Sequence, residues 1–228
     1  MPMKTLALLP GFMLDDALWD DFVPQLPGDW QVQRTALPRG RTVSEVAEGV
    51  AAALTGPAVV LGFSMGGYVA RALAGAHPER VRALVLVATS SREERAASTQ
   101  AVAMGQASFA GLSRRAIQRS LSREHAQDAA LIERVHAMSV RLGPEAFAWQ
   151  SALDRTGVPL RGITCPTLVV AARDDQLRSI EESRELADAI EGARLDVLEG
   201  TGHLIPIEAP AALANTFVDW WLSQPGGA

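Results

Sequence analysis

The sequence predicts an α/β fold built on a parallel central sheet. Six short apolar runs bounded by glycine or proline have the length of strands. Several are apolar without alternation, which is typical of strands covered on both faces in a parallel sheet. Helical patterns lie between most of these runs, and strands alternating with helices indicate the α/β class. The predicted strands are Met3–Leu9, Gln31–Leu37, Ala58–Phe63, Ala83–Ala88, Thr167–Ala172 and Arg194–Leu198.

Four helices are predicted between or after these strands. Thr42–Glu45 has the pattern of a capping box, which opens a helix that runs to about Leu54. Met65–Ala76 is a helix of small residues that ends before a proline. Ser179–Ile190 is amphipathic and is followed by a glycine stop signal. Ala209–Leu222 is the last predicted helix, with aromatic side chains for packing.

The alternation of strands and helices breaks once, between the fourth and fifth predicted strands. That stretch has no convincing strand and predicts several short helices, including His125–Arg141 and Pro144–Asp154. We therefore expect a core of residues 1–88 and 162–228, with residues 89–161 inserted as a helical cap over one edge of the sheet. The insert holds ten arginines and seven acidic residues, a net charge of +3, whereas the remainder carries −8. This asymmetry indicates either a functional surface or an accident of composition.

Length and composition exclude several classes of protein. The 228 residues are 48% hydrophobic and 21% charged, which excludes disorder as the main state. The net charge of −5 argues against a bulk affinity for nucleic acid. Cys165 is the only cysteine, so neither an intrachain disulfide nor a cysteine-based metal site is expected. Because neither a targeting segment nor an apolar run of about 18 residues is visible, we expect a cytoplasmic protein that does not span a membrane.

The strongest motif is Gly62-Phe63-Ser64-Met65-Gly66, a G-x-S-x-G pattern. It follows a predicted strand and opens a predicted helix, which is the setting of a nucleophile elbow. The turn is so sharp that the residues two positions before and after the serine must lack bulk, and both are glycines. The N-terminus of the following helix also favours negative charge near Ser64. These features predict that Ser64 is a nucleophile.

A serine hydroxyl needs a base, and the base needs a carboxylate that orients it. His203 lies in a glycine-flanked loop directly after a predicted strand, where open α/β folds place functional groups. Of the other histidines, His77 lies in a helix-ending turn and is interpreted as structural, while His125 and His136 lie in predicted cap helices and are interpreted as solvated or packed. The acid is expected after the preceding strand, where Asp174 and Asp175 are both candidates. The resulting order, Ser…Asp…His, is the one expected for a triad on an elbow of this kind.

An oxyanion hole needs backbone N–H groups aimed at the tetrahedral oxygen. One donor is expected to be the N–H of Met65, the residue after the nucleophile. The second is expected from the loop after the first strand, Leu9–Met13, where Gly11 allows a close backbone approach. Ser/His/Asp chemistry requires neither a metal ion nor an organic cofactor, and none is expected.

Together these motifs make the chain resemble the α/β-hydrolase-fold family over nearly its whole length. The chain is similar to the small bacterial carboxylesterases of the branch that includes the pimeloyl carrier-protein methyl ester esterases and the 3-oxoadipate enol-lactonases. The segments that carry the resemblance are Leu8–Phe12, Gly62–Gly67, Pro166–Val170, Gly202–Leu204 and Ile207–Pro210.

The resemblance implies an α/β-hydrolase fold with a mostly parallel sheet of about six strands, without the family's N-terminal hairpin and with a helical cap inserted. In the family the acid sits three residues after a glycine at a strand end. Here Ala172 fills the glycine position, so Asp175 aligns as the acid. The family's first loop usually contains His-Gly, which Pro10-Gly11 replaces, and Phe12 aligns as the second N–H donor.

The resemblance and the intact triad positions predict a serine hydrolase. It would cleave carboxylic esters of small or medium acyl groups through an acyl-enzyme intermediate. A lactonase or a thioesterase would use the same groups. A non-catalytic ligand-binding module is the alternative of another class, because fold alone does not fix function. A dinucleotide-binding protein is excluded, since the first loop lacks G-x-G-x-x-G.

Candidate substrate contacts come from the cap and from the loops beside the triad. Aromatic residues are candidate apolar liners, although helix packing explains each of them equally well: Phe63, Phe109, Phe147 and Trp149. Cap arginines recur at spacings that allow one helix face: Arg114, Arg115, Arg119 and Arg123. They would attract a carboxylate-bearing substrate or an acidic carrier protein, or else form a solvated basic face. The sequence does not predict the oligomeric state.

Overall fold

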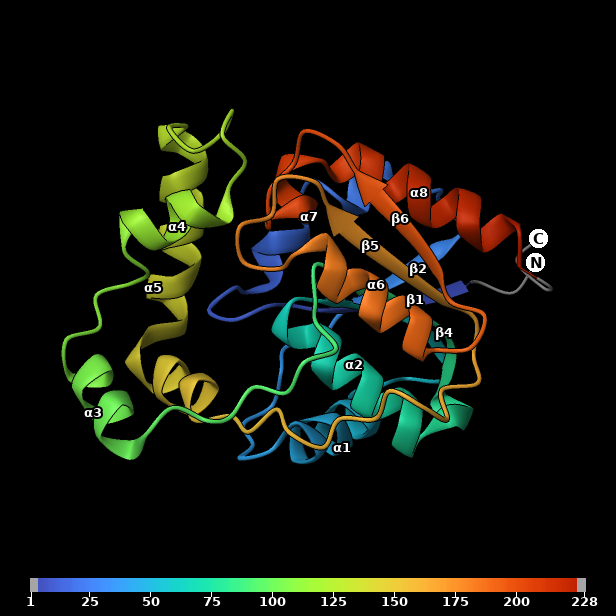
Figure 1. Ribbon diagram of the computed structural model, residues 1–228, viewed down its shortest axis with the longest axis horizontal. Coiled ribbons are helices and arrows are strands. Elements are labelled where there is room, and N and C mark those ends of the chain that lie inside the picture. Colours follow the sequence, from blue (N-terminus) through green and yellow to red (C-terminus); the bar gives the residue numbers. More distant parts are fainter. Residues whose placement is uncertain (1–3, 225–228) are drawn as a thin grey trace.

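The computed structural model describes residues 4–224, and its centre is a six-stranded sheet (Figure 1). Across the sheet the strands follow the order β2-β1-β3-β4-β5-β6, and each neighbouring pair is parallel. The predicted α/β fold with about six strands is therefore confirmed. Met3, the first residue of the first predicted strand, lies outside the described residues. The strands are β1 (Lys4–Leu9), β2 (Trp30–Arg34), β3 (Ala58–Phe63), β4 (Val81–Val87), β5 (Thr167–Ala172) and β6 (Arg194–Leu198).

Helices cover both faces of the sheet, because successive strand residues point to opposite sides. On one face, Leu8 and its neighbours pack with the aromatic side chains of α8. On the other face, Leu9 and its neighbours pack with α1, α2 and α6. The α-helices are α1 (Val43–Ala53), α2 (Met65–Ala76), α3 (Thr99–Ala107), α4 (Arg114–Ser120), α5 (Ala129–Ser151), α6 (Ile180–Ala189), α7 (Ile205–Glu208) and α8 (Pro210–Leu222), and short 3₁₀ helices span Asp16–Trp19, Val23–Gln25 and Pro78–Arg80.

Several predicted boundaries are wrong, among them those of the fourth strand, which spans Val81–Val87, and of the second cap helix, which ends at Ser151; the neighbouring structure explains two others. The second strand ends at Arg34 rather than Leu37, because it lies at the sheet edge and its only partner, β1, offers no pairing beyond Leu8. The predicted helix at His125 begins only at Ala129. There the Asp128 side chain accepts hydrogen bonds from two backbone N–H groups of the first turn and caps the helix.

The predicted capping box before α1 forms only in part. Thr42 Oγ1 accepts a hydrogen bond from the N–H of Glu45 at 3.2 Å, as the motif requires. The Glu45 carboxylate, however, accepts from the N–H of Arg41 at 2.8 Å instead of that of Thr42. A complete box opens α6, where Ser179 and Glu182 bond to each other's backbone N–H groups.

The chain between β4 and β5 forms helices α3, α4 and α5, which lie together at one end of the molecule, on the left in Figure 1. Within α5 the helix breaks at Gly143, with φ of 77°, so a second helical segment starts at Pro144 as predicted. The boundaries of a separate cap at residues 89–161 remain a prediction. Among residues 4–224, no helix combines the length and the apolar character needed to cross a membrane.

The carboxyl ends of the parallel strands all meet at the edge of the sheet that faces these helices (Figure 1). Four of those ends lead into the segments that the sequence singles out. β1 leads to Phe12, β3 to Ser64, β5 to Asp175 and β6 to His203. The topology thus brings together residues that lie far apart in the chain.

Candidate active site

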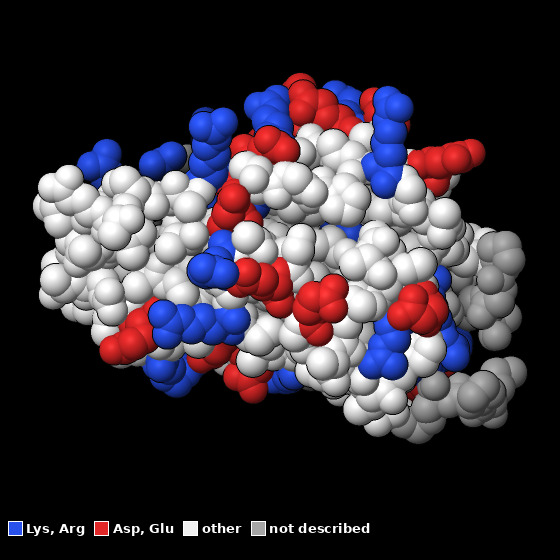
Figure 2. Space-filling model, turned by 90° about the horizontal axis from the view of Figure 1, so that it is seen from below, with Lys and Arg blue, Asp and Glu red and all other residues white. Residues whose placement is uncertain are grey.

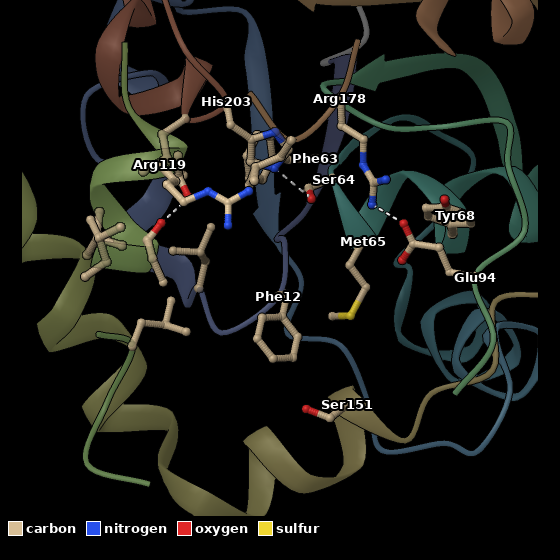
Figure 3. Close-up of a pocket in the computed structure, with 18 of the residues that line it drawn as sticks. Phe12, Phe63, Ser64, Met65, Tyr68, Glu94, Arg119, Ser151, Arg178 and His203 are labelled. Atoms are coloured by element: carbon tan, nitrogen blue, oxygen red, sulfur yellow. Dashed lines mark hydrogen bonds and ion pairs between the residues drawn. The ribbon is translucent and has the colours of Figure 1, made fainter. Parts of the chain in front are cut away.

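Ser64 occupies the sharp turn between β3 and α2. Its backbone has φ of 51° and ψ of −114°, in the positive-φ region that residues with a side chain rarely adopt. Two hydrogen bonds hold the turn: Ser64 N–H donates to the carbonyl of Val87 at 2.9 Å, and Thr89 Oγ1 donates to the carbonyl of Ser64 at 2.8 Å. The turn presents the Ser64 hydroxyl to His203 (Figure 3).

The glycines around Ser64 are sterically required. A Cβ on Gly62 would lie 2.4 Å from the carbonyl oxygen of Gly66, and a Cβ on Gly66 would lie 2.5 Å from that of Leu9. A Cβ on Gly67 would lie 2.6 Å from the side chain of Thr89. Because each contact is closer than atoms can approach, the elbow needs glycine at these places, as the motif predicts.

His203 connects Ser64 to a buried carboxylate. Its Nε2 lies 3.0 Å from Ser64 Oγ, and its Nδ1 lies 2.8 Å from Asp175 Oδ2. His203 is only 6% exposed and the Asp175 side chain only 1%, so water has little access to either hydrogen bond. An anionic carboxylate accepts only, so the bond to Asp175 places the ring proton on Nδ1 and leaves Nε2 free to accept the serine proton.

Of the two adjacent aspartates, Asp175 is the one that reaches His203. Its Oδ1 accepts hydrogen bonds from the N–H groups of Leu177 at 2.7 Å and Arg178 at 2.9 Å, while Oδ2 faces the imidazole. Asp174 is exposed and its side chain has no hydrogen bond within residues 4–224. Of the two candidates that the sequence left open, the geometry therefore places Asp175, and not Asp174, beside His203.

Two backbone N–H groups beside Ser64 are available to a ligand. Those of Phe12 and Met65 take part in no hydrogen bond within the described part of the chain. The loop that carries Phe12 passes close to Ser64, since a Cβ on Gly11 would lie 2.9 Å from the Phe63 ring and 3.3 Å from Ser64 Cβ. This arrangement fits the oxyanion hole expected from the sequence.

A cavity of about 620 Å³ opens in front of Ser64 and His203 (Figure 3). Part of its wall is apolar, including Phe12, Phe63 and Ile117, and part is polar, including Ser151. The cavity lies between the strand ends of the core and the residues of α4 and α5. A substrate bound there would contact both the triad and the helices of the insert.

Of the four predicted aromatic liners, the structure brings one to the cavity. Phe63 lines it, whereas Phe109, Phe147 and Trp149 are not among its described lining residues. Phe109 stacks on Phe147 with 4.7 Å between ring centroids, and Phe147 packs edge-on against Phe12 at 5.9 Å. These rings therefore support the cavity wall from behind. The indole of Trp149 borders a separate cavity of about 400 Å³ beside β2.

A charged cluster on the cavity wall was missed from the sequence. The Glu94 carboxylate forms ion pairs with Arg155, at 2.5 Å, and with Arg178. Burial alone raises the pKa of Glu94, but the charges and hydrogen bonds of the two arginines outweigh it, so the pKa lies below its ordinary value. Glu94 thus joins the segment that follows α5 to the loop that holds Asp175. The three residues form no spacing pattern, so no sequence signal marks them.

A second polar cluster holds the His203 loop. The side chain of Glu208 is fully buried and accepts hydrogen bonds from the N–H of Gly202 at 3.1 Å and of Ser122 at 2.7 Å. Its Oε2 also lies 3.1 Å from Nδ1 of His125. The segment Ile207–Pro210 belongs to the motifs that carry the family resemblance, but this role of Glu208 was not predicted.

The two other histidines form contacts away from the triad. His77 Nε2 lies 2.9 Å from a carboxylate oxygen of Glu48, and His136 Nδ1 donates to the carbonyl of Leu112 at 2.9 Å. Both are therefore held by structural contacts, as expected.

Comparison with known proteins agrees with this geometry. A family model described as "Alpha/beta hydrolase family" matches residues 6–216, which include all four strand ends of the site. The chain belongs to the alpha/beta hydrolase family. This membership confirms the family and the fold that the sequence predicts, and with them a hydrolase whose relatives act on ester bonds.

Individual relatives give the likeness more detail. A pimeloyl-[acyl-carrier protein] methyl ester esterase from Neisseria meningitidis serogroup B / serotype 15 (strain H44/76) is 32% identical over 243 residues, covering 95% of this chain and 93% of the relative. A thermophilic esterase from Thermogutta terrifontis has a TM-score of 0.80 at 26% identity, covering 95% of this chain and 89% of its own. An enol-lactonase from Burkholderia xenovorans LB400 has a TM-score of 0.81 at 22% identity, covering 95% and 90%, and shows the shared fold.

Proposed function

We propose that the chain is a serine hydrolase that cleaves carboxylic esters of small or medium acyl groups. The observation that carries the proposal is the unbroken chain of hydrogen bonds from Ser64 Oγ through His203 to Asp175, with distances of 3.0 Å and 2.8 Å. A serine, a histidine and a carboxylate in this relation form the arrangement that activates a hydroxyl for acyl transfer. Its position in a cavity in front of the turn supports a role in binding and catalysis.

In the first half of the reaction, Ser64 Oγ attacks the ester carbonyl while His203 Nε2 accepts its proton. The negative charge that develops on the carbonyl oxygen is stabilised by the N–H groups of Phe12 and Met65 and by the N-terminus of α2. His203 then donates the proton to the departing alcohol. The acyl group remains on Ser64 as an ester.

In the second half, His203 Nε2 takes a proton from a water molecule, which attacks the acyl-enzyme. The tetrahedral intermediate collapses, the carboxylic acid leaves, and Ser64 regains its proton from the imidazole. Asp175 fixes the tautomer of His203 and stabilises the imidazolium in both halves. Its two N–H donors, from Leu177 and Arg178, hold the carboxylate in place for that task.

The size of the cavity supports a small or medium acyl group. Its volume of about 620 Å³ falls in the range of small-molecule sites, about 300–1,000 Å³. The apolar part of the wall, with Phe12, Phe63 and Ile117, suits an acyl chain. Acyl groups that exceed this wall would have to extend into solvent.

An ester joined to an acidic carrier protein is a second candidate substrate. The relative from Neisseria meningitidis is named for an acyl-carrier-protein ester. In this chain Arg114, Arg115, Arg119 and Arg123 are all exposed on or beside α4, and Figure 2 shows basic side chains along one edge of the same end of the molecule. Reversing Arg115 and Arg119 to glutamate would weaken hydrolysis of a carrier-linked ester far more than of a small ester, whereas equal effects would exclude carrier docking there.

The proposal is tested with a series of p-nitrophenyl esters from acetyl to dodecanoyl, using the wild type, Ser64→Ala and Ser151→Ala. Ser151 is a matched control because it also lines the cavity but lies outside the triad. We expect Ser64→Ala to lose hydrolysis by about 10³-fold or more. Ser151→Ala should still hydrolyse the esters, because the Ser64 nucleophile remains in place. The acyl chain length that is hydrolysed fastest should report the size of the acyl site.

The outcomes separate the alternatives. Full activity of Ser64→Ala would overturn the assignment of the nucleophile. If the wild type hydrolyses lactones or thioesters but none of these esters, the proposed substrate class would change and the triad assignment would stand. A wild type that hydrolyses none of these, yet binds a ligand equally well with Ser64→Ala, would favour the binding module.

A further inference from the structure

The charges on the wall of the catalytic cavity are not balanced. Among its described lining residues, four are arginines and one is acidic: Arg95, Arg119, Arg155, Arg178 and Glu94. Glu94 forms ion pairs with both Arg155 and Arg178, and Arg178 also pairs with Glu182 at 3.8 Å. The other two guanidinium groups form no ion pair with any residue from 4 to 224. Two of the four arginines on the wall, Arg95 and Arg119, are therefore not compensated by an ion pair within the described part of the protein.

Arg119, one of these two arginines without an ion pair, lies beside His203 in Figure 3. Its side chain extends from α4 toward the space in front of His203 and Ser64, on the side of the cavity opposite Arg178 and Glu94. No hydrogen bond joins its guanidinium to the described residues. Its five N–H donors are thus available to a bound molecule, in a geometry that suits a carboxylate or a phosphate.

The backbone of Arg119 is held in a fixed relation to His203. Ser113 caps α4 by accepting from the N–H of Ala116 at 3.2 Å, and Ile117 is buried against the core. At the other end of the helix, the carbonyl of Ser120 accepts from the N–H of Leu204 at 3.2 Å. Ser120 follows Arg119 and Leu204 follows His203, so this bond couples the two positions directly.

Neighbouring arginines of the same helix do not share this position. Arg115 lies one turn before Arg119 on the same face of α4 and is exposed like Arg119, but it is not among the described residues that line the cavity. An anion attracted merely by the basic surface would respond to both residues. An anion bound inside the cavity would respond to Arg119 alone.

We infer that the natural ester carries an anionic group, and that Arg119 binds this group while Ser64 attacks the ester carbonyl. The apolar wall formed by Phe12, Leu112 and Ile117 would hold the carbon chain between the two ends. The anion is either the carboxylate of a dicarboxylic monoester or the phosphate of a longer acyl-carrying arm. This inference rests on the proposed ester hydrolysis and adds the charge of the substrate to it.

The test compares matched substrates. Methyl hydrogen adipate and methyl hydrogen pimelate are paired with methyl hexanoate and methyl heptanoate, which have the same carbon chains without the carboxylate. The ratio of kcat/KM for the anionic ester to that for the neutral ester is measured in the wild type, Arg119→Gln and Arg115→Gln. We expect Arg119→Gln to lower this ratio about 10- to 100-fold, the effect of losing a charge-assisted hydrogen-bonded pair. Arg115→Gln should keep the wild-type ratio.

Other results overturn the inference or assign the anion. The same acyl methyl ester linked to phosphopantetheine is measured as well. If Arg119→Gln changes neither the ratio for the small esters nor kcat/KM for the phosphopantetheine-linked ester, or if Arg115→Gln lowers them equally, a specific contact at Arg119 is contradicted. If Arg119→Gln lowers kcat/KM only for the phosphopantetheine-linked ester and leaves the ratio for the small esters unchanged, the anion is the phosphate rather than a carboxylate. If the wild type hydrolyses none of these esters, nor the p-nitrophenyl esters, the proposed function itself fails. Hydrolysis without any dependence on Arg119 removes only the inference.

Discussion

The carboxylate of Glu208 accepts a hydrogen bond from the N–H of Gly202, one residue before His203, at 3.1 Å. Through its second oxygen, Glu208 also accepts from Ser122 in the segment that follows α4. Gly202 is packed so tightly there that a Cβ would lie 2.4 Å from the backbone nitrogen of Ser122. A single buried carboxylate therefore holds the triad histidine loop against the inserted helices.

Replacing Glu208 by glutamine should lower kcat about 10-fold with a smaller change in KM, because one of its two backbone donors would face an amide N–H and the loop would shift. The measurement is kcat and KM with a p-nitrophenyl ester, together with Tm. Glu48→Gln is the matched control, since Glu48 contacts His77 away from the triad. Equal kcat in both variants would show that Glu208 does not position His203.

Replacing each of the two neighbouring aspartates by asparagine should have very different effects on kcat. Asp175→Asn should lower kcat about 10³- to 10⁴-fold, because an amide opposite Nδ1 favours the wrong tautomer of His203. Asp174→Asn should keep the wild-type kcat, since the Asp174 side chain is exposed and makes no contact with the imidazole. Steady-state rates of the two variants decide the matter, and a large loss in Asp174→Asn would mean that the acid is misassigned.

The close packing of the elbow predicts a stability difference between two glycine substitutions. Gly66→Ala should lower the free energy of unfolding by about 2–3 kcal/mol, because its Cβ would lie 2.5 Å from the carbonyl oxygen of Leu9. Gly56→Ala should change it by less than about 0.5 kcal/mol, because no atom lies within 4 Å of the added Cβ. Chemical denaturation of both variants gives the two values, and similar values would contradict the steric explanation.

The shared ion pairs of Glu94 predict a pH-dependent contribution to stability. Because the pKa of Glu94 is lowered in the folded state, its contribution is present above the ordinary value of 4.5 and is lost as the pH falls through the folded-state pKa. Glu94→Gln should therefore lower the free energy of unfolding by about 1–3 kcal/mol at neutral pH. The difference from the wild type should shrink on acidification.

Urea denaturation at a series of pH values measures this difference. Glu133→Gln serves as the control, because Glu133 is exposed and forms no ion pair within the described residues. A difference between Glu94→Gln and the wild type that stays constant with pH would show that the charge of Glu94 is not its source.

Much of the fold follows from local sequence patterns. The strand–turn–helix around Ser64 is predictable because its glycines and its apolar strand lie within one short segment, and α2 spans the predicted residues. The end of β2 is not predictable in the same way, since it depends on where β1 stops offering partners. Likewise, Asp128 caps α5 although the apolar pattern begins earlier.

The residues of the candidate site likewise fall into those that local sequence patterns predict and those that only the folded chain brings together. Ser64 and His203 lie in recognisable loops at strand ends, so their meeting could be predicted from the topology of a parallel sheet. Glu94, Arg155 and Arg178 come from three separate segments and meet only in the folded chain. The sequence gives no signal that separates aromatic residues of a cavity wall from those packed behind it. Phe63 lines the cavity, whereas Phe147 packs behind the wall, and the sequence alone did not distinguish them.

The central claim is that Ser64 is the nucleophile of the triad. The most direct measurement is labelling of the wild type with a fluorophosphonate, followed by peptide mapping by mass spectrometry. We expect one label per chain, on Ser64, with none on Ser151 in the same cavity and a large loss of labelling in His203→Ala. A label on another residue, or no label in a preparation that hydrolyses esters, would contradict the account.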